Sequence, residues 1–253
     1  MHTVKSFFSA IKYSLNLVVR EKLYLYFSFA ILISLLFYYI FSGGEALSSK
    51  LSFMEDWWII GWIVTSFESF FSFISFMIFE FLVLVLLSPV NAILAEKVRE
   101  DITGEKLEFS ISVFLSSLRR MVVIIIVGIC LQLLFMIVFW LLSFLFGDFF
   151  FEIASILTIA FFIGFSFFDF ILELEGINSR KSWKYARKNW FACILIGLVF
   201  NLGIYYPQKH DLLIIYVIAI ALLPHLLSMA ATKMYLSANH NPTKDATIPI
   251  KTD

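Results

Sequence analysis

Residues 121–147 read MVVIIIVGICLQLLFMIVFWLLSFLFG, without a single charged side chain. An α-helix needs about 20 apolar residues to cross a hydrocarbon layer about 30 Å thick, so this stretch is long enough to span a membrane. Asp148 follows at once, and residues 149–172 form a second apolar stretch in which only Glu152 and Asp169 are charged. Because the connection is so short, the two stretches predict an antiparallel helical hairpin in a membrane.

Further apolar stretches lie at residues 23–41, 57–87, 190–206 and 212–232. The last two are joined by five residues and predict a second hairpin. Hydrophobic residues make up 61% of the chain and charged residues 15%, against about 25% charged residues in a soluble domain. The sequence therefore predicts an all-α integral membrane protein. We expect residues 1–236 to form one membrane domain and residues 237–253 to be a disordered polar tail.

The basic residues divide sharply among the connections between these stretches. Seventeen of the nineteen Lys and Arg residues fall before the first stretch, between the second and third, between the fourth and fifth, and after the sixth. Lys50 and Lys209 are the exceptions. The positive-inside rule places such basic connections in the cytoplasm. Both termini, residues 92–120 and residues 174–189 are therefore predicted to be cytoplasmic, in a multi-pass protein of the inner (plasma) membrane.

The sequence lacks the usual signatures of soluble enzymes. It contains no P-loop, H-E-x-x-H, G-x-S-x-G or C-x-x-C motif, so we expect neither an enzyme nor a bound cofactor. Cys130 and Cys193 both lie in apolar stretches, where two thiols are too few for a metal site. The formal net charge is zero, which gives no reason to expect nucleic acid as a partner.

Ionisable residues inside apolar stretches are the better functional candidates, because a carboxylate in a bilayer must face protein or water. Glu68 and Glu80 interrupt residues 57–87, and Glu68 shares a helix face with Ser72 and Ser75. Two interpretations are open: these groups line a hydrated pathway, or they join helices through buried hydrogen bonds. Asp169 is the third candidate of this kind.

Two basic segments predict contact with the membrane surface. Residues 1–22 carry apolar side chains at helical spacing, which is typical of either an interfacial amphipathic helix or an ordinary cytoplasmic capping helix. Residues 180–190 combine five cations with Trp183 and Trp190. That combination favours anchoring to anionic lipid headgroups over RNA binding or substrate steering.

The stretch Ser88-Pro89-Val90-Asn91-Ala92-Ile93-Leu94-Ala95-Glu96-Lys97-Val98, with Thr103-Gly104 after it, resembles the helix-breaking motif of the CysZ-type sulfate permeases and their etoposide-induced-protein relatives. Phe168-Asp169-Phe170 with Glu173 looks like that family's Tyr-x-Asp-Tyr-Pro-x-Asp segment. Pro207, Pro224 and Ala231-Thr232 resemble positions of its final hairpin. The resemblance covers about residues 15–236. Pro89 lacks a backbone donor, so we expect a kink or break near residues 88–91.

The resemblance implies two long transmembrane helices and two hairpins that only partly penetrate the bilayer, assembled as a homo-oligomer that admits sulfate. Sulfate-binding members carry a Pro-Gly-Leu-Arg-Arg-like segment before the first span. Here that region reads Val18-Val19-Arg20-Glu21-Lys22-Leu23, so Glu21 stands between the two cations.

The first functional hypothesis is a permease or channel-like protein for a small anion such as sulfate. The alternative is a membrane scaffold or assembly factor that transports nothing. An anion site needs positive potential, for which the candidates are Arg20, Lys22, Arg119 and Arg120. Pathway or helix-break candidates are Glu68, Glu80, Pro89, Asn91, Glu96 and Asp169.

Overall fold

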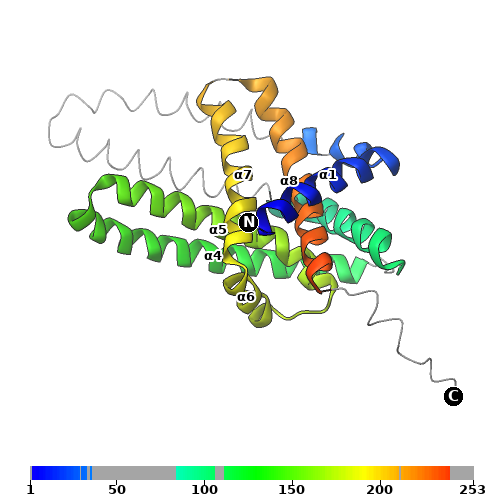
Figure 1. Ribbon diagram of the computed structural model, residues 1–253, viewed down its shortest axis with the longest axis horizontal. Helices are drawn as coiled ribbons and strands as arrows, with labels where there is room; N and C mark the ends of the chain where they lie inside the picture. The colour runs from blue at the N-terminus through cyan, green and yellow to red at the C-terminus, as the bar shows by residue number, and fades with distance from the viewer. Residues whose placement is uncertain are drawn as a thin grey trace, which may run out of the picture.

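A computed structural model describes residues 2–28, 30–32, 35, 84–105, 111–210 and 212–239. Its helices are α1 (His2–Arg20), α4 (Ile111–Phe146), α5 (Asp148–Leu174), α6 (Ser179–Lys188), α7 (Trp190–Lys209) and α8 (Leu213–Asn239). Residues 24–28 and 84–103 are also helical, and no strand occurs in the described ranges. Figure 1 shows α4 and α5 as one long hairpin, with the α7–α8 hairpin running across it.

Four of the described helices are long and apolar enough to cross a membrane. Their spans are Arg119–Phe146, Phe149–Leu174, Trp190–Pro207 and Ile214–Asn239. They are the arms of the two predicted hairpins, so the prediction of an all-α membrane protein is confirmed. The apolar stretches at residues 23–41 and 57–87 lie largely outside the described residues.

The first hairpin has one outer and one inner helix. Gly147 makes the turn with a φ of 83°, a conformation in which a Cβ atom would be strained. In the most apolar part of each helix, 28% of the positions of α4 are buried, against 78% for α5. α5 is therefore the most enclosed of the four described spans, whereas most of the α4 span is not buried.

α5 crosses α7 at a very close backbone approach. A Cβ atom on Gly164 would lie 1.8 Å from the carbonyl oxygen of Cys193, and one on Gly197 would lie 1.8 Å from that of Ala160. Each helix thus contributes two small residues four positions apart, the spacing that lets membrane helices pack backbone against backbone. This crossing fixes the second hairpin against the first.

α1 packs against α8 through one of its faces. The buried positions Phe7, Ala10, Ser14 and Leu17 recur every three or four residues and form that face. Phe8 and Val19 point elsewhere and are largely exposed. α1 is therefore docked on the bundle; whether its exposed apolar side chains enter the membrane interface stays a prediction.

α6 is the short basic helix between the two hairpins. Gly176, at a φ of 67°, ends the preceding turn. Asn178 caps the helix by accepting a hydrogen bond from the backbone N–H of Lys181 at 3.0 Å. Ser182 and Ala186 face the bundle and are buried. The helix is thereby held across the end of the bundle, at the base of α5 and α7.

Candidate functional site

The predicted cytoplasmic segments meet at one end of the bundle, and ion pairs join them. Arg99 donates to the carboxylates of Glu175 and Glu105, each at 2.8 Å. Arg99 belongs to the 84–103 helix and Glu175 to the turn after α5, so 76 residues separate the partners. The segments that the charge pattern assigned to one side of the membrane therefore lie together in space.

Arg20, the first anion-site candidate, already has carboxylate partners. Its guanidinium pairs with Asp101 of the 84–103 helix, and its Nε donates to Glu21 at 3.1 Å. The hydroxyl of Tyr13 donates to the same Asp101 carboxylate, and Lys233 of α8 lies 4.7 Å from the centre of the Tyr13 ring. The cluster ties α1 to two other helices and neutralises the positive charge that an anion would need.

This cluster also affects the ionisation of Tyr13. Burial, and then the hydrogen bond to the Asp101 carboxylate, raises the pKa of Tyr13 well above its ordinary value of 10.0. Both effects favour the neutral phenol, because a phenolate beside a carboxylate would be repelled. The hydrogen bonds to Asp101 and Glu21 raise the pKa of Arg20, so this cation stays charged.

Arg120, another candidate, is bound even more completely. Its Nε and Nη2 donate to the two oxygens of Asp169 at 3.0 and 2.6 Å, a bidentate pair. The remaining donors reach the carbonyl of Ile177 and, at 2.7 Å, the hydroxyl of Ser182. The Asp169 side chain is 2% exposed and that of Arg120 is 14% exposed. Arg120 therefore joins α4, α5 and α6 through its hydrogen bonds.

Arg119, the neighbour of Arg120 in the sequence and also a candidate, lies in a different environment. Successive residues of an α-helix point about 100° apart, so one can face the bundle while the other faces away. Arg119 is exposed. Lys22 is exposed as well, at the turn after α1, with a positive φ of 53°. Neither of these two cations has an ion-pair partner among the described residues.

Of the pathway candidates, Asn91 occupies the most informative place. It is fully buried, and its Oδ1 lies 2.7 Å from Nδ1 of His225 on α8. Ser228 of α8 donates to the Asn91 carbonyl at 3.4 Å. The Phe27 ring packs edge-on against His225 at 5.0 Å between centroids. Asn91 thus connects the 84–103 helix to α8 in an otherwise apolar region.

This polar pair is incompletely satisfied. Neither Nδ2 of Asn91 nor Nε2 of His225 has a hydrogen-bond partner among the described residues, although both atoms are buried. Buried polar atoms of this kind are costly in an apolar environment. His225 and Ser228 were not among the predicted site residues. The signal that could have singled them out was a histidine within an apolar stretch, because such residues line cavities or pair with other polar groups.

The remaining candidates give a mixed result. Residues 84–103 are helical throughout, so the chain does not break between residues 88 and 91. Membrane helices tolerate proline where neighbouring groups satisfy the freed backbone, and a kink at Pro89 stays a prediction. Glu96 is half-buried on the same helix. Glu68 and Glu80 lie outside the described residues.

The chain matches the protein family described as "Sulfate transporter CysZ/Etoposide-induced protein 2.4" over residues 7–208. No curated protein and no solved structure matches it. The matched region runs from α1 into α7 and includes both the Asn91 segment and Asp169, two of the places where the sequence suggested this resemblance. Pro224 and Ala231-Thr232 lie beyond it. The match extends over most of the chain, which therefore belongs to the sulfate transporter CysZ/etoposide-induced protein 2.4 family.

Proposed function

We propose that the protein is a permease or channel-like protein for a small anion, with sulfate as the first solute to test. Membership of a family named for a sulfate transporter carries this proposal. The bundle of membrane-length helices supports it, because such a protein can enclose a route across a bilayer. We further propose a homo-oligomer in the inner (plasma) membrane with both termini in the cytoplasm.

The ion pairs narrow the choice of residues that attract the anion. Arg20 and Arg120 are occupied by Asp101 and Asp169, and they support the helix arrangement instead. Lys22 and Arg119 are exposed, and neither has an ion-pair partner among the described residues. Such cations at the mouth of a pathway raise the local concentration of an anion by electrostatic attraction. We assign that role to Lys22 and Arg119.

A double variant, Lys22→Ala with Arg119→Ala, tests this assignment. Proteoliposomes are placed in a solution of labelled sulfate at low ionic strength, and the initial rate of sulfate uptake is measured. The double variant should lower this rate about tenfold, the smallest effect expected when charges raise the local concentration of a ligand. The matched control is Lys5→Ala with Lys12→Ala, which removes two exposed cations from α1. Equal uptake by the two double variants would rule out the assigned role.

One observation favours the alternative, a scaffold or assembly factor. Two of the four cations expected at the anion site are neutralised by carboxylates, an arrangement that stabilises a structure and does not attract an anion. A scaffold should leave sulfate permeability at the level of protein-free vesicles. Uptake by the wild-type protein above that level would exclude a purely structural role.

A further inference from the structure

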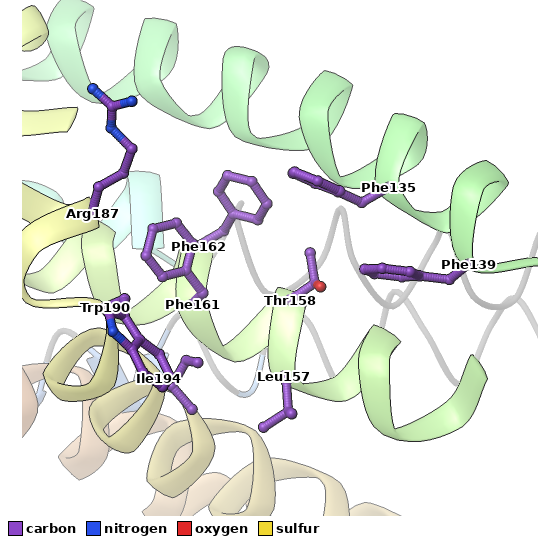
Figure 2. Close-up of a pocket in the computed structure, with 9 residues that line it drawn as sticks. All are labelled: Phe135, Phe139, Leu157, Thr158, Phe161, Phe162, Arg187, Trp190 and Ile194. Atoms are coloured by element: carbon purple, nitrogen blue, oxygen red, sulfur yellow. The ribbon is translucent and has the colours of Figure 1, made fainter. Parts of the chain in front are cut away.

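A groove between the first hairpin and the start of α7 has one charged end. It encloses about 320 Å³ between α4, α5 and the start of α7. Its lining residues are Phe135, Phe139, Leu157, Thr158, Phe161, Phe162, Arg187, Trp190 and Ile194. Figure 2 shows Arg187 at one end of this set and Phe135 and Phe139 at the other. The groove is therefore apolar along its length and cationic at one end.

Between the charged end and the phenylalanine end, the groove has one hydroxyl side chain, that of Thr158. The Thr158 hydroxyl donates to the Ala154 carbonyl within α5 at 2.7 Å, so its proton is already hydrogen-bonded within the helix. Phe135 and Phe139 stack at 5.9 Å between ring centroids, and Phe135 and Leu157 are exposed. In a bilayer, such an open apolar surface is covered by hydrocarbon chains.

The charged end has the composition of a headgroup site. Arg187 is exposed and has no ion-pair partner among the described residues. It belongs to α6, which carries five cations and no acidic residue between Ser179 and Lys188. Trp190, also exposed, adds an indole ring of the type found at the membrane–water interface. A guanidinium in this setting matches a phosphate by charge and by its donor geometry.

We propose that this groove binds one acyl chain of an anionic phospholipid, with the lipid phosphate on Arg187. The occupant is a membrane lipid because the apolar length and the single cation correspond to the two ends of one amphiphile. A soluble anion would use only Arg187, and an uncharged hydrocarbon would use only the groove. The site is separate from Lys22 and Arg119, so it stands independently of the proposed anion permeation.

Photoactivatable lipids test this site directly. Phosphatidylglycerol and phosphatidylcholine carrying a diazirine near the end of one acyl chain are incorporated separately into proteoliposomes, irradiated, and their crosslinks mapped by mass spectrometry. Phosphatidylglycerol should label the α4 and α5 residues of the groove about fivefold more than phosphatidylcholine, the factor expected from one basic residue near the headgroup. Equal labelling by the two lipids would overturn the proposal.

Three further comparisons separate the contributions of charge and groove. Arg187→Gln should lower labelling by phosphatidylglycerol more than labelling by phosphatidylcholine, whose phosphate is balanced by its own choline cation, and should therefore abolish the preference for phosphatidylglycerol. Arg180→Gln removes a cation from the same helix outside the groove and should leave the preference intact. Leu157→Trp fills the groove without a change in charge, and it should reduce labelling by both lipids. A preference that survives Arg187→Gln, or labelling that survives Leu157→Trp, would contradict the proposed site.

A competition and a folding control complete the design. Excess inorganic phosphate should not remove the labelling by phosphatidylglycerol, because the acyl chain contributes to binding. Displacement by phosphate alone would show a site for free anions and overturn the lipid assignment. Circular dichroism and gel filtration in detergent should give the same helical content and particle size for every variant compared. Ile194→Trp fills the groove from α7 and replaces Leu157→Trp should that variant fail these controls.

Discussion

The buried pair between Arg120 and Asp169 is the most consequential interaction at the scale of single residues. One guanidinium joins two helices of a hairpin to the connection and helix that follow them. The sequence singled out both residues, but for different roles and without pairing them. Apolar periodicity predicts which residues are buried; it does not specify which helix faces Asp169, 49 positions away.

Removing one partner of this pair leaves the other charge buried. Arg120→Ala and Asp169→Ala should each lower the free energy of unfolding by about 3–5 kcal/mol, the cost of an uncompensated buried charge. Thermal unfolding in detergent measures the effect, with the exposed neighbour Arg119→Ala as the control. Similar melting temperatures for Arg119→Ala and Arg120→Ala would show that the pair contributes little.

Tyr13 gives a pH dependence at the same scale. Its pKa is raised in the folded state, so the unfolded chain loses this proton at lower pH than the folded protein does. The stabilisation is complete below about pH 10 and is lost as the pH rises above that value. Unfolding midpoints measured between pH 8 and 11.5 should fall more steeply for the wild type than for Tyr13→Phe. If the unfolding midpoints of the wild type and Tyr13→Phe fall equally with pH, the raised pKa of Tyr13 is contradicted.

At the scale of helices, the sequence predicts which helices form better than it predicts where each helix begins and ends. The hairpins expected at residues 121–172 and 190–232 are α4–α5 and α7–α8. α4 begins at Ile111, ten residues before the uncharged stretch, because a helix continues beyond the apolar part that hydropathy detects. α7 includes Pro207, although hydropathy alone ends the apolar stretch at residue 206. The sequence does not single out the small residues at the α5–α7 crossing, because their spacing is common in membrane helices.

That crossing makes a sharp prediction about glycines. Gly164→Ala and Gly197→Ala each place a Cβ atom against backbone of the facing helix, so the helices must separate. Each should cost about 1–3 kcal/mol or more in unfolding free energy, as overpacking does. Gly128→Ala is the matched control on α4, because its Cβ would meet only a Phe162 ring atom at 3.6 Å, an ordinary contact. Equal stability of all three variants would refute the close crossing.

At the scale of the whole molecule, the ion pairs gather the basic connections at one end of the bundle. Arg20, Arg99 and Arg120 each bind a carboxylate from another segment, so α1, the 84–103 helix and the base of α5 share that end. The charge pattern predicted this grouping, since one rule places all these connections on one side. It could not predict the individual pairs, which depend on how the helices pack.

The predicted membrane topology, with the basic connections in the cytoplasm, can be tested by labelling single cysteines. In a Cys130→Ser, Cys193→Ala background, single cysteines at Lys12 and Lys184 should react with a membrane-impermeant maleimide only from the cytoplasmic side. A cysteine at Lys50 should react only from the opposite side, because that connection follows the first apolar stretch. Inside-out and right-side-out vesicles provide the comparison. Labelling of positions 50 and 184 from the same side would exclude the predicted arrangement.

The central claim, that this member of the family admits a small anion, is tested most directly by the flux of labelled sulfate into liposomes. Wild-type protein should give uptake well above protein-free vesicles, and unlabelled sulfate outside the vesicles should compete with it. Sulfate entry no faster than into vesicles without protein would contradict the claim and leave the scaffold as the function of this chain.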